Sequence, residues 1–330
     1  MSPPHVLVFV RLLADRSLRP TAMLLEVPEP GDAIETSLLE WVHHPAFAGV
    51  AQRVQWAILA SQAAQLSEST QQFLAQAGCK TLDASSVYRT DGPAKPELPP
   101  TATWLDGEWY LAPPPQPGNT RSASRSQALR LVQLVVADAD TRDIEDVFRQ
   151  DPALSYHLLR LVNSVGMGAG RQITSFSQAI LMLGRQQLRR WLNLMLFSAS
   201  HEDHRSAMLP TRVTWRSRLM ELLAREAGMD RSDQDLAFMT GMFSMLGFLF
   251  GSPLPDVLAT LPLHETLVAA VLRQEGELGQ LLALVQSYER QDAAGVLEGL
   301  DRLSISGSDF HQLCLESSQW MLELLHGMQE

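Results

Sequence analysis

The stretch from Phe238 to Gly251, FMTGMFSMLGFLFG, contains no charged side chain. Its only hydroxyl groups belong to Thr240 and Ser244. A helix that is apolar on every side belongs in the middle of a core rather than at its surface. We therefore expect a long helix over 234–250 at the centre of the fold. Its apolar run is shorter than the roughly 20 residues that a membrane span requires.

The overall composition is that of a globular protein. A chain of 330 residues is long enough for two domains. Its net charge of -11 argues against nonspecific binding to nucleic acid or to anionic membranes. The N-terminal apolar run, VLVFV, is too short for a signal peptide. We expect a cytoplasmic protein without membrane insertion or nucleic-acid partner, and with buried, reduced thiols at Cys79 and Cys314.

The first part of the chain, residues 1–118, has a mixed pattern that predicts a small α/β region. Residues 93–117 hold eight of the 19 prolines, a density that excludes a helix or a central strand. Within this Pro-rich segment, an Asp106-Gly107 turn signal between apolar residues predicts a small hairpin over 101–112. The other expected elements are strands at 6–10, 22–27 and 79–82 and helices at 34–41, 48–65 and 68–76, with Gly78 as a helix C-cap.

From residue 121 onward the sequence is a succession of amphipathic helices with short connections. Asp151-Pro152, for example, supplies an N-cap followed by proline at the first helical position. We expect an all-helical domain over 119–330. Its best-marked helices lie at 126–137, 151–163, 175–184, 185–200, 210–227, 234–250, 263–273, 278–290 and 306–325.

Three segments of this helical part stand out: DPALSYHLLRLVNS (151–164), ITSFSQAILMLGRQQLRRWL (173–192) and the stretch FMTGMFSMLGFLFG. Together they resemble the HDOD domain, a bacterial signalling module related to HD-type phosphohydrolases. The resemblance implies an HD-superfamily-like helix bundle. The segment at 262–292 is similar to the tail of the subgroup that joins an EAL domain to HDOD.

The N-terminal part resembles an EAL domain, but only in pieces. HVLVFVRLLADRSLRPTAMLLEV (5–27) is similar to the first hairpin of that domain, and GEWYLAPPPQPG (107–118) is similar to its end. Too few residues lie between them for an eight-stranded barrel, and no Glu-Ala-Leu motif occurs. We expect residues 1–118 to be a truncated, degenerate EAL-like α/β remnant, which makes the chain α+β overall.

The resemblance also locates the metal ligands that an HD hydrolase would need. Ser217, next to Trp215-Arg216, takes the place of the first histidine, and Ser244 and Met245 take the place of the His-Asp pair. A metal hydrolase uses imidazole and carboxylate ligands to hold its ion and activate water. We therefore expect no metal, no cofactor and no catalytic residue in this domain.

Several other residues allow two interpretations. Arg185, Arg189 and Arg190 form either a contact for an acidic partner or anion, or a solvated helix face whose cations are paired. His201 and His204 form either a metal site or part of a polar loop. Asn163 and the glycines that follow it form a structural loop rather than a phosphate cradle. Lys80 and Asp83 mark a strand and its turn rather than a catalytic pair.

Taken together, these features predict a non-catalytic bacterial signal-transduction adaptor that binds protein partners, in regulation linked to cyclic-di-GMP. One alternative is a receptor that binds cyclic-di-GMP or another nucleotide without hydrolysing it. A further alternative is a residual metal-dependent phosphodiesterase that uses His201 and His204.

Overall fold

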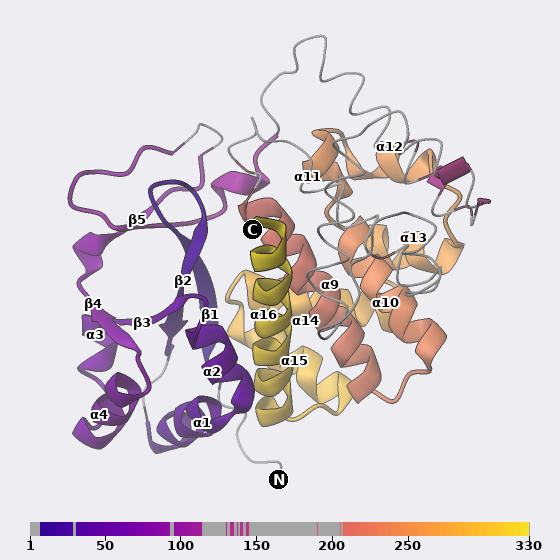
Figure 1. Cartoon of the computed structure of the whole chain (residues 1–330). Coiled ribbons are helices and arrows are strands. Elements are labelled where there is room, and N and C mark those ends of the chain that lie inside the picture. The colour runs from indigo at the N-terminus through magenta and orange to yellow at the C-terminus, as the bar shows by residue number, and fades with distance from the viewer. Residues whose placement is uncertain are drawn as a thin grey trace, which may run out of the picture.

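The computed structural model describes residues 7–28, 31–92, 96–113 and 207–329, together with isolated positions between 130 and 205. Within these residues the chain is α+β, as expected, with a curled N-terminal sheet and a C-terminal group of helices (Figure 1). The motifs at 151–164 and 173–192 lie outside the described residues, apart from Arg190. No helix in the described part of the chain has the length and apolar character needed to cross a lipid bilayer.

The sheet has six strands in the order β4-β3-β2-β1-β6-β5. β1 is antiparallel to both of its neighbours, whereas the remaining neighbours pair in parallel. The β1–β2 hairpin matches the hairpin expected at the start of the chain. The strands span Phe9–Ala14 (β1), Pro20–Glu26 (β2), Gln55–Leu59 (β3), Lys80–Leu82 (β4), Val87–Arg89 (β5) and Trp104–Asp106 (β6).

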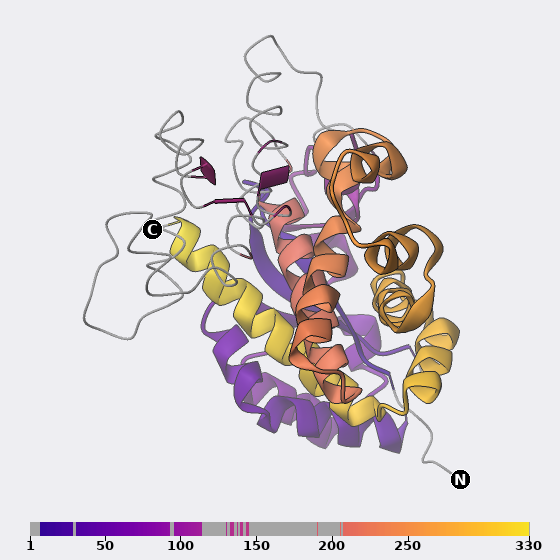
Figure 2. The same cartoon turned by 90° about the vertical axis from the view of Figure 1, so that its right-hand side faces the viewer.

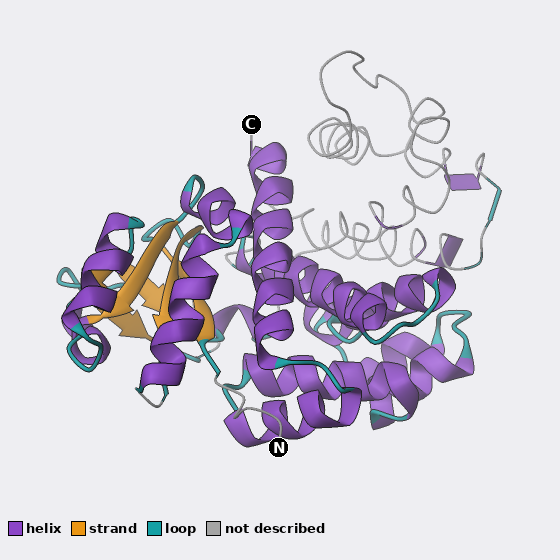
Figure 3. Ribbon diagram, turned by 90° about the horizontal axis from the view of Figure 1, so that it is seen from below, coloured by secondary structure: helices purple, strands orange, loops and turns teal. Residues whose placement is uncertain are grey.

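Alternation along β2 gives the sheet two apolar faces. Met23 and Leu25 pack against helices on the outer face, whereas Ala22 and Leu24 pack inside the curl. Figure 3 shows the curled sheet with helices along its outside. The helices of this region are α1 (Asp32–His43), α2 (Pro45–Ala51), α3 (Ala60–Ala63) and α4 (Glu68–Gln76).

Three predictions for this region are wrong. The Pro-rich segment 93–117 does contain an interior strand, since β6 lies between β1 and β5. The helix expected over 48–65 is interrupted by β3, because Trp56 stacks on Phe47 with ring centroids 4.6 Å apart and is buried against the sheet. The hairpin expected over 101–112 is absent from these residues, since β6 pairs with β1 and β5 instead. After Gly107, with φ of 119°, the chain forms a 3₁₀ turn over Trp109–Leu111.

The helices expected at 210–227, 263–273, 278–290 and 306–325 are confirmed within a few residues, whereas α12 and α15 were not predicted. The expected long helix over 234–250 is wrong at Ser244-Met245, where a turn separates α10 from α11. The observed helices are α9 (Met208–Glu226), α10 (Arg231–Phe243), α11 (Leu246–Phe250), α12 (Leu254–Ala259), α13 (Glu265–Arg273), α14 (Gly276–Glu289), α15 (Ala293–Leu303) and α16 (Gly307–Gln329).

The central position of FMTGMFSMLGFLFG is confirmed for most of its length. Phe238, Met242 and Met245 are fully buried. Asp230 starts α10, because its carboxylate accepts the N–H groups of Ser232 and Asp233. The stretch is most exposed near its end, where Phe248 is 36% exposed.

The sheet and the helical part share their cores across residue 118. α16 runs between the two parts (Figures 1 and 2). Its residues Leu315 and Leu322 pack in the same cluster as the sheet residues Met23 and Trp56. In the other direction, Phe9 packs among the helices. This junction brings side chains from both parts of the chain into one polar network.

Candidate functional site

The candidate site lies where α9 crosses α10. Gly241 permits the close approach, since a Cβ atom added to it would lie 2.9 Å from the Cα of Ser217. Ser217 is fully buried, and its hydroxyl donates to the carbonyl of Val213 at 2.8 Å. Ser217 therefore serves as a small residue at a tight helix crossing, with its one polar group already bonded.

Ser244 sits on the other side of the crossing, at the end of α10. Its hydroxyl donates to the carbonyl of Gly241 at 2.6 Å and accepts a hydrogen bond of 2.7 Å from a terminal nitrogen of Arg216. The next residue, Met245, is buried in the apolar core. The three positions at which the sequence resemblance places HD ligands thus hold two bonded hydroxyls and a packed thioether.

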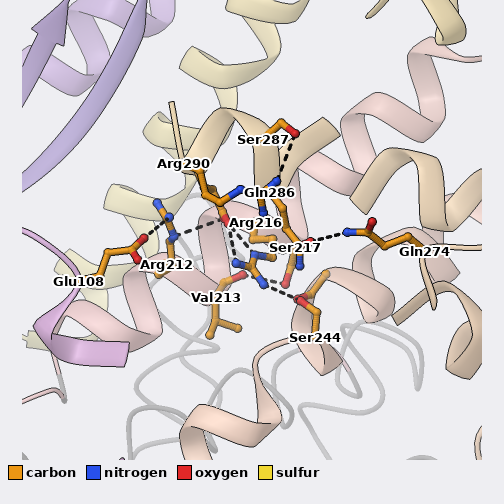
Figure 4. A network of polar contacts seen from close by, with 12 residues as sticks. Glu108, Arg212, Val213, Arg216, Ser217, Ser244, Gln274, Gln286, Ser287 and Arg290 are labelled. Carbon is orange, nitrogen blue, oxygen red and sulfur yellow. Dashed lines mark hydrogen bonds and ion pairs between the residues drawn. The ribbon is translucent and has the colours of Figure 1, made fainter. Parts of the chain in front are cut away.

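Arg216 is the centre of this network (Figure 4). Its Nε donates to one carboxylate oxygen of Glu289 at 2.9 Å, and a terminal nitrogen donates to the other at 2.5 Å. Both side chains are almost completely buried, with exposures of 6% and 3%. Such a two-pronged pair has both strong attraction and a fixed geometry. The pair connects α9 to α14, and the hydrogen bond from Arg216 to Ser244 connects α9 to α10 as well.

A second arginine extends the network toward the sheet. The Nε of Arg212 lies 3.3 Å from Glu289, and a terminal nitrogen lies 3.3 Å from Glu108, which follows β6. Burial alone would raise the pKa of Glu289, but the charges of Arg212 and Arg216 outweigh it and lower the pKa. Glu289 is therefore a carboxylate held ionised between two guanidinium groups.

This arrangement is poor in the groups that hold a metal ion. A divalent cation bound at Ser244 would be within a few ångströms of the Arg216 guanidinium, and two such charges repel strongly in a buried site. The one carboxylate that touches Arg216 already has both oxygens engaged. In the described ranges, no group of three or more His, Cys, Asp or Glu side chains is placed to share a metal ion.

Of the three arginines predicted as a partner or anion contact, the structure places one. Arg190 pairs with Glu221 at 2.7 Å and with Asp235, and it lies over the ring of Phe238 at 4.7 Å. Its side chain is only 12% exposed, so its charge is engaged in joining α9 to α10. Arg185 and Arg189 lie outside the described residues, as do His201, His204 and Asn163.

Several other polar residues lie at turns, strand starts or helix ends. Asp83 accepts the N–H of Ser85 at the start of a 3₁₀ turn, and Lys80 begins β4. His44 and His264 accept backbone N–H groups as the N-caps of α2 and α13. These contacts are those of turns and helix ends.

The sequence interpretation missed Arg212, Arg216 and Glu289 as a unit. One available signal was the spacing of the two arginines, which are four residues apart and so share a face of α9. No comparable signal connects them to Glu289, which is 73 positions away from Arg216. The pairing depends on how α14 docks against α9.

Comparison with known proteins gives one matching domain and two curated relatives. Residues 125–284 match the HDOD domain. Over 187 residues the chain is 29% identical to "Cyclic di-GMP phosphodiesterase CdgJ" of Vibrio cholerae serotype O1, an alignment that covers 57% of this chain and 43% of CdgJ. Over 197 residues it is 26% identical to "Uncharacterized protein YuxH" of Bacillus subtilis, covering 59% of this chain and 47% of YuxH. The alignments therefore span less than half of either relative.

Two crystal structures from Shewanella amazonensis SB2B, of proteins that carry phosphohydrolase names, align with TM-scores of 0.43 and 0.39 at 15% identity. They cover 62% and 60% of this chain, and 93% and 90% of their own chains. Scores at this level support no statement about fold or activity. The three motifs at 151–164, 173–192 and 238–251, by contrast, all fall inside the range matched by the family. Residues 125–284 of this chain are an HDOD domain.

Proposed function

We propose that this chain is a non-catalytic bacterial signal-transduction adaptor that acts through protein–protein contacts in cyclic-di-GMP-linked regulation. The HDOD domain supports the signalling role. The name of the Vibrio relative supports the link to cyclic-di-GMP. That name also denotes a phosphodiesterase, so the local chemistry of this chain has to decide whether it hydrolyses a substrate.

One observation carries the non-catalytic proposal: Arg216 is bonded to Ser244 and paired with Glu289. A hydrolytic HD site concentrates metal charge where water must be activated. Here the corresponding position carries a fixed side-chain cation whose charge is already balanced. The network stabilises the crossing of α9, α10 and α14, which is a requirement of a rigid binding scaffold.

We also propose that residues 1–118 are a truncated, degenerate EAL-like region. The observed β1–β2 hairpin at the start of the chain is consistent with this origin. Met23-Leu24-Leu25 lies on β2, where such a domain would carry Glu-Leu-Leu, so Met23 takes the place of the glutamate. An apolar strand of this kind contributes to a core rather than to metal binding.

A second candidate is a receptor that binds cyclic-di-GMP or another nucleotide without cleaving it. The name of the Vibrio relative favours this nucleotide over others. Calorimetric titration of the full chain with cyclic-di-GMP tests it, and absence of heat at high micromolar protein removes it. Metal analysis of freshly purified protein tests the remaining alternative, a metal enzyme that uses His201 and His204, which requires a stoichiometric ion.

The adaptor role is tested by capturing partners from the native host with the immobilised full chain. The informative variant reverses Arg185 and Arg189 but leaves Arg190, which is engaged with Glu221 and Asp235. A matched control reverses Arg225, which is 51% exposed. We expect the Arg185/Arg189 variant to lose a partner that the control retains. Identical partner sets for both variants would contradict the predicted contact surface.

A further inference from the structure

A cavity of about 260 Å³ lies between the sheet and the helical part. Its walls come from β1, β2 and α1 on one side and from α9, α14 and α16 on the other. Ligand sites occur preferentially at such junctions between structural units. Five aromatic side chains line the cavity: Trp41, Trp56, Tyr110, Trp215 and Tyr288.

Three buried donors in the lining have no hydrogen-bond partner among the described residues. They are the indole N–H of Trp41 and the Nε–H groups of Arg11 and Arg212, although the Nε of Arg212 lies 3.3 Å from Glu289 as an ion pair. The terminal nitrogens of Arg11 are bonded to Asp106 and Glu26, which fixes its guanidinium in place. A buried donor without a partner costs about 1–3 kcal/mol. An occupant that supplies hydrogen-bond acceptors would remove this cost.

The charged residues of the lining favour an anionic occupant. Four arginines line the cavity, and three of them are paired with carboxylates. Arg11 pairs with Asp106 and Glu26. Arg212 pairs with Glu289 and Glu108, and Arg89 pairs with Asp91 and Asp106. Arg290 differs, because within the part of the chain that the structure describes it forms no ion pair within 4 Å. Its guanidinium makes a hydrogen bond of 3.4 Å to Ser287, and its charge acts on Glu289 only at longer range. Arg290 is therefore an exposed cation at the cavity. The buried lining groups that have no partner in the described ranges are all hydrogen-bond donors.

We propose that this cavity binds a small aromatic anion, a single or fused ring that carries one carboxylate, sulfonate or phosphate. The aromatic walls suit a flat ring. Trp41, Arg11 and Arg290 suit the acidic group. The volume lies just below the range of roughly 300–1,000 Å³ typical of drug-sized ligands, so a cyclic dinucleotide is too large.

Because its walls come from both parts of the chain, a bound ligand holds the sheet against the helices. In the proposed adaptor this ligand is the input signal, a role that rests on the proposed function. The binding itself does not, since it is measured without any partner protein. Failure to find a partner and failure to bind a ligand are therefore separate results.

The test is a titration of the full chain with 2-naphthoate, followed by calorimetry and by tryptophan fluorescence, since Trp41, Trp56 and Trp215 line the cavity. The matched neutral ligand is 2-naphthalenemethanol, which has the same ring system without the charge. We expect saturable binding of one naphthoate per chain, and binding of the alcohol that is weaker by roughly tenfold or more.

Two conservative variants locate the site. Trp41→Phe keeps an aromatic ring but removes the N–H donor, and Arg290→Gln removes the cation from an exposed position. Each variant should weaken the binding of naphthoate by about fivefold to tenfold and leave the affinity for the alcohol unchanged. Arg225→Gln serves as the control and should alter neither affinity. Thermal melting of each variant shows that it remains folded.

Absence of saturable naphthoate binding would overturn the proposal, as would equal affinities for naphthoate and the alcohol. Unchanged affinity in both Trp41→Phe and Arg290→Gln would place the ligand elsewhere and would also overturn it. Displacement of naphthoate by cyclic-di-GMP would contradict the size argument and favour the nucleotide receptor instead.

Discussion

Arg216 on α9 donates to both carboxylate oxygens of Glu289 on α14, and both side chains are almost fully buried. The pair connects two helices, although its two residues are 73 positions apart in the sequence. A third bond from Arg216 to Ser244 reaches the end of α10 at the position where an HD hydrolase would carry a metal ligand. The same side chain thus organises the crossing of three helices and places a fixed cation beside Ser244.

Removal of the Arg216 charge should destabilise the protein strongly. In Arg216→Met, Glu289 retains only Arg212 at 3.3 Å and becomes an under-compensated buried carboxylate. Breaking a buried pair from one side costs about 3–5 kcal/mol. Urea unfolding measures this loss. The double variant Arg216→Met/Glu289→Met should recover a large part of it, because replacing both charges by apolar groups removes the unpaired charge.

Arg225→Met is the matched control for this experiment. Arg225 also lies on α9 and pairs with Glu316 at 3.5 Å, but it is 51% exposed. Its replacement should change the free energy of unfolding by less than about 1 kcal/mol. Equal losses in Arg216→Met and Arg225→Met would show that the buried pair does not hold the crossing together.

Gly241→Ala tests the close approach of α9 and α10. Helix propensity alone predicts a gain of about 1 kcal/mol for this replacement in a helix interior. The added Cβ would lie 2.9 Å from the Cα of Ser217 and 3.2 Å from the carbonyl of Arg216. Overpacking of this kind costs about 1–3 kcal/mol, so we expect net destabilisation. Gly92→Ala, whose Cβ has no neighbour closer than 3.7 Å, is the control, and a stabilised Gly241→Ala would refute the tight crossing.

Low pH should reduce the stability of the protein through His311, which lies at the junction between the sheet and α16. Burial lowers the pKa of His311 from 6.5 to about 4, and its Nε2 accepts the N–H of Val8 at 3.0 Å. The unfolded chain therefore binds a proton that the folded chain rejects, and stability falls as the pH drops from 6.5 to about 4. The resulting loss in the free energy of unfolding from His311 amounts to at most about 3 kcal/mol.

His311→Gln keeps an oxygen acceptor for Val8 but cannot be protonated in this window. Its unfolding free energy, measured by urea titration across the same pH range, should fall less steeply than that of the wild type. Parallel curves for the two proteins would mean that His311 does not carry the acid sensitivity.

Arg190→Glu should destabilise the protein rather than act on a partner alone. The new carboxylate would face Glu221 and Asp235, which are 13% and 20% exposed and would lose their shared cation. We expect a loss of about 3 kcal/mol in thermal or urea unfolding. Arg225→Glu, next to Glu316, should cost less than about 1 kcal/mol. If the two variants melt alike, Arg190 is free to serve as a contact residue after all.

Sequence patterns were sufficient for the helices whose apolar residues recur on one face. α9, α13, α14 and α16 begin and end within a few residues of the expected positions. β3 was missed because the segment around it is rich in Ala and Gln, which favour helix. Trp56 overrides that preference, since its burial against Phe47 and the sheet outweighs local propensity.

The candidate site could be predicted only in part. Ser217, Ser244 and Met245 were singled out because the resemblance to HD hydrolases marks their positions. Arg216 and Glu289 were not, because a salt bridge between distant helices leaves no local pattern in the chain. The cavity beside Trp41 likewise depends on the docking of α16 against the sheet. Arrangements of this kind are set by tertiary packing rather than by periodicity.

The central claim is that the HDOD domain of this chain does not hydrolyse its signal molecule. The most direct test is cyclic-di-GMP hydrolysis by the purified full chain with Mg²⁺, Mn²⁺ or Fe²⁺, with product followed by chromatography. The account predicts no product above the protein-free blank with any of the three ions. Turnover that requires one of these ions and disappears in Ser244→Ala would contradict it.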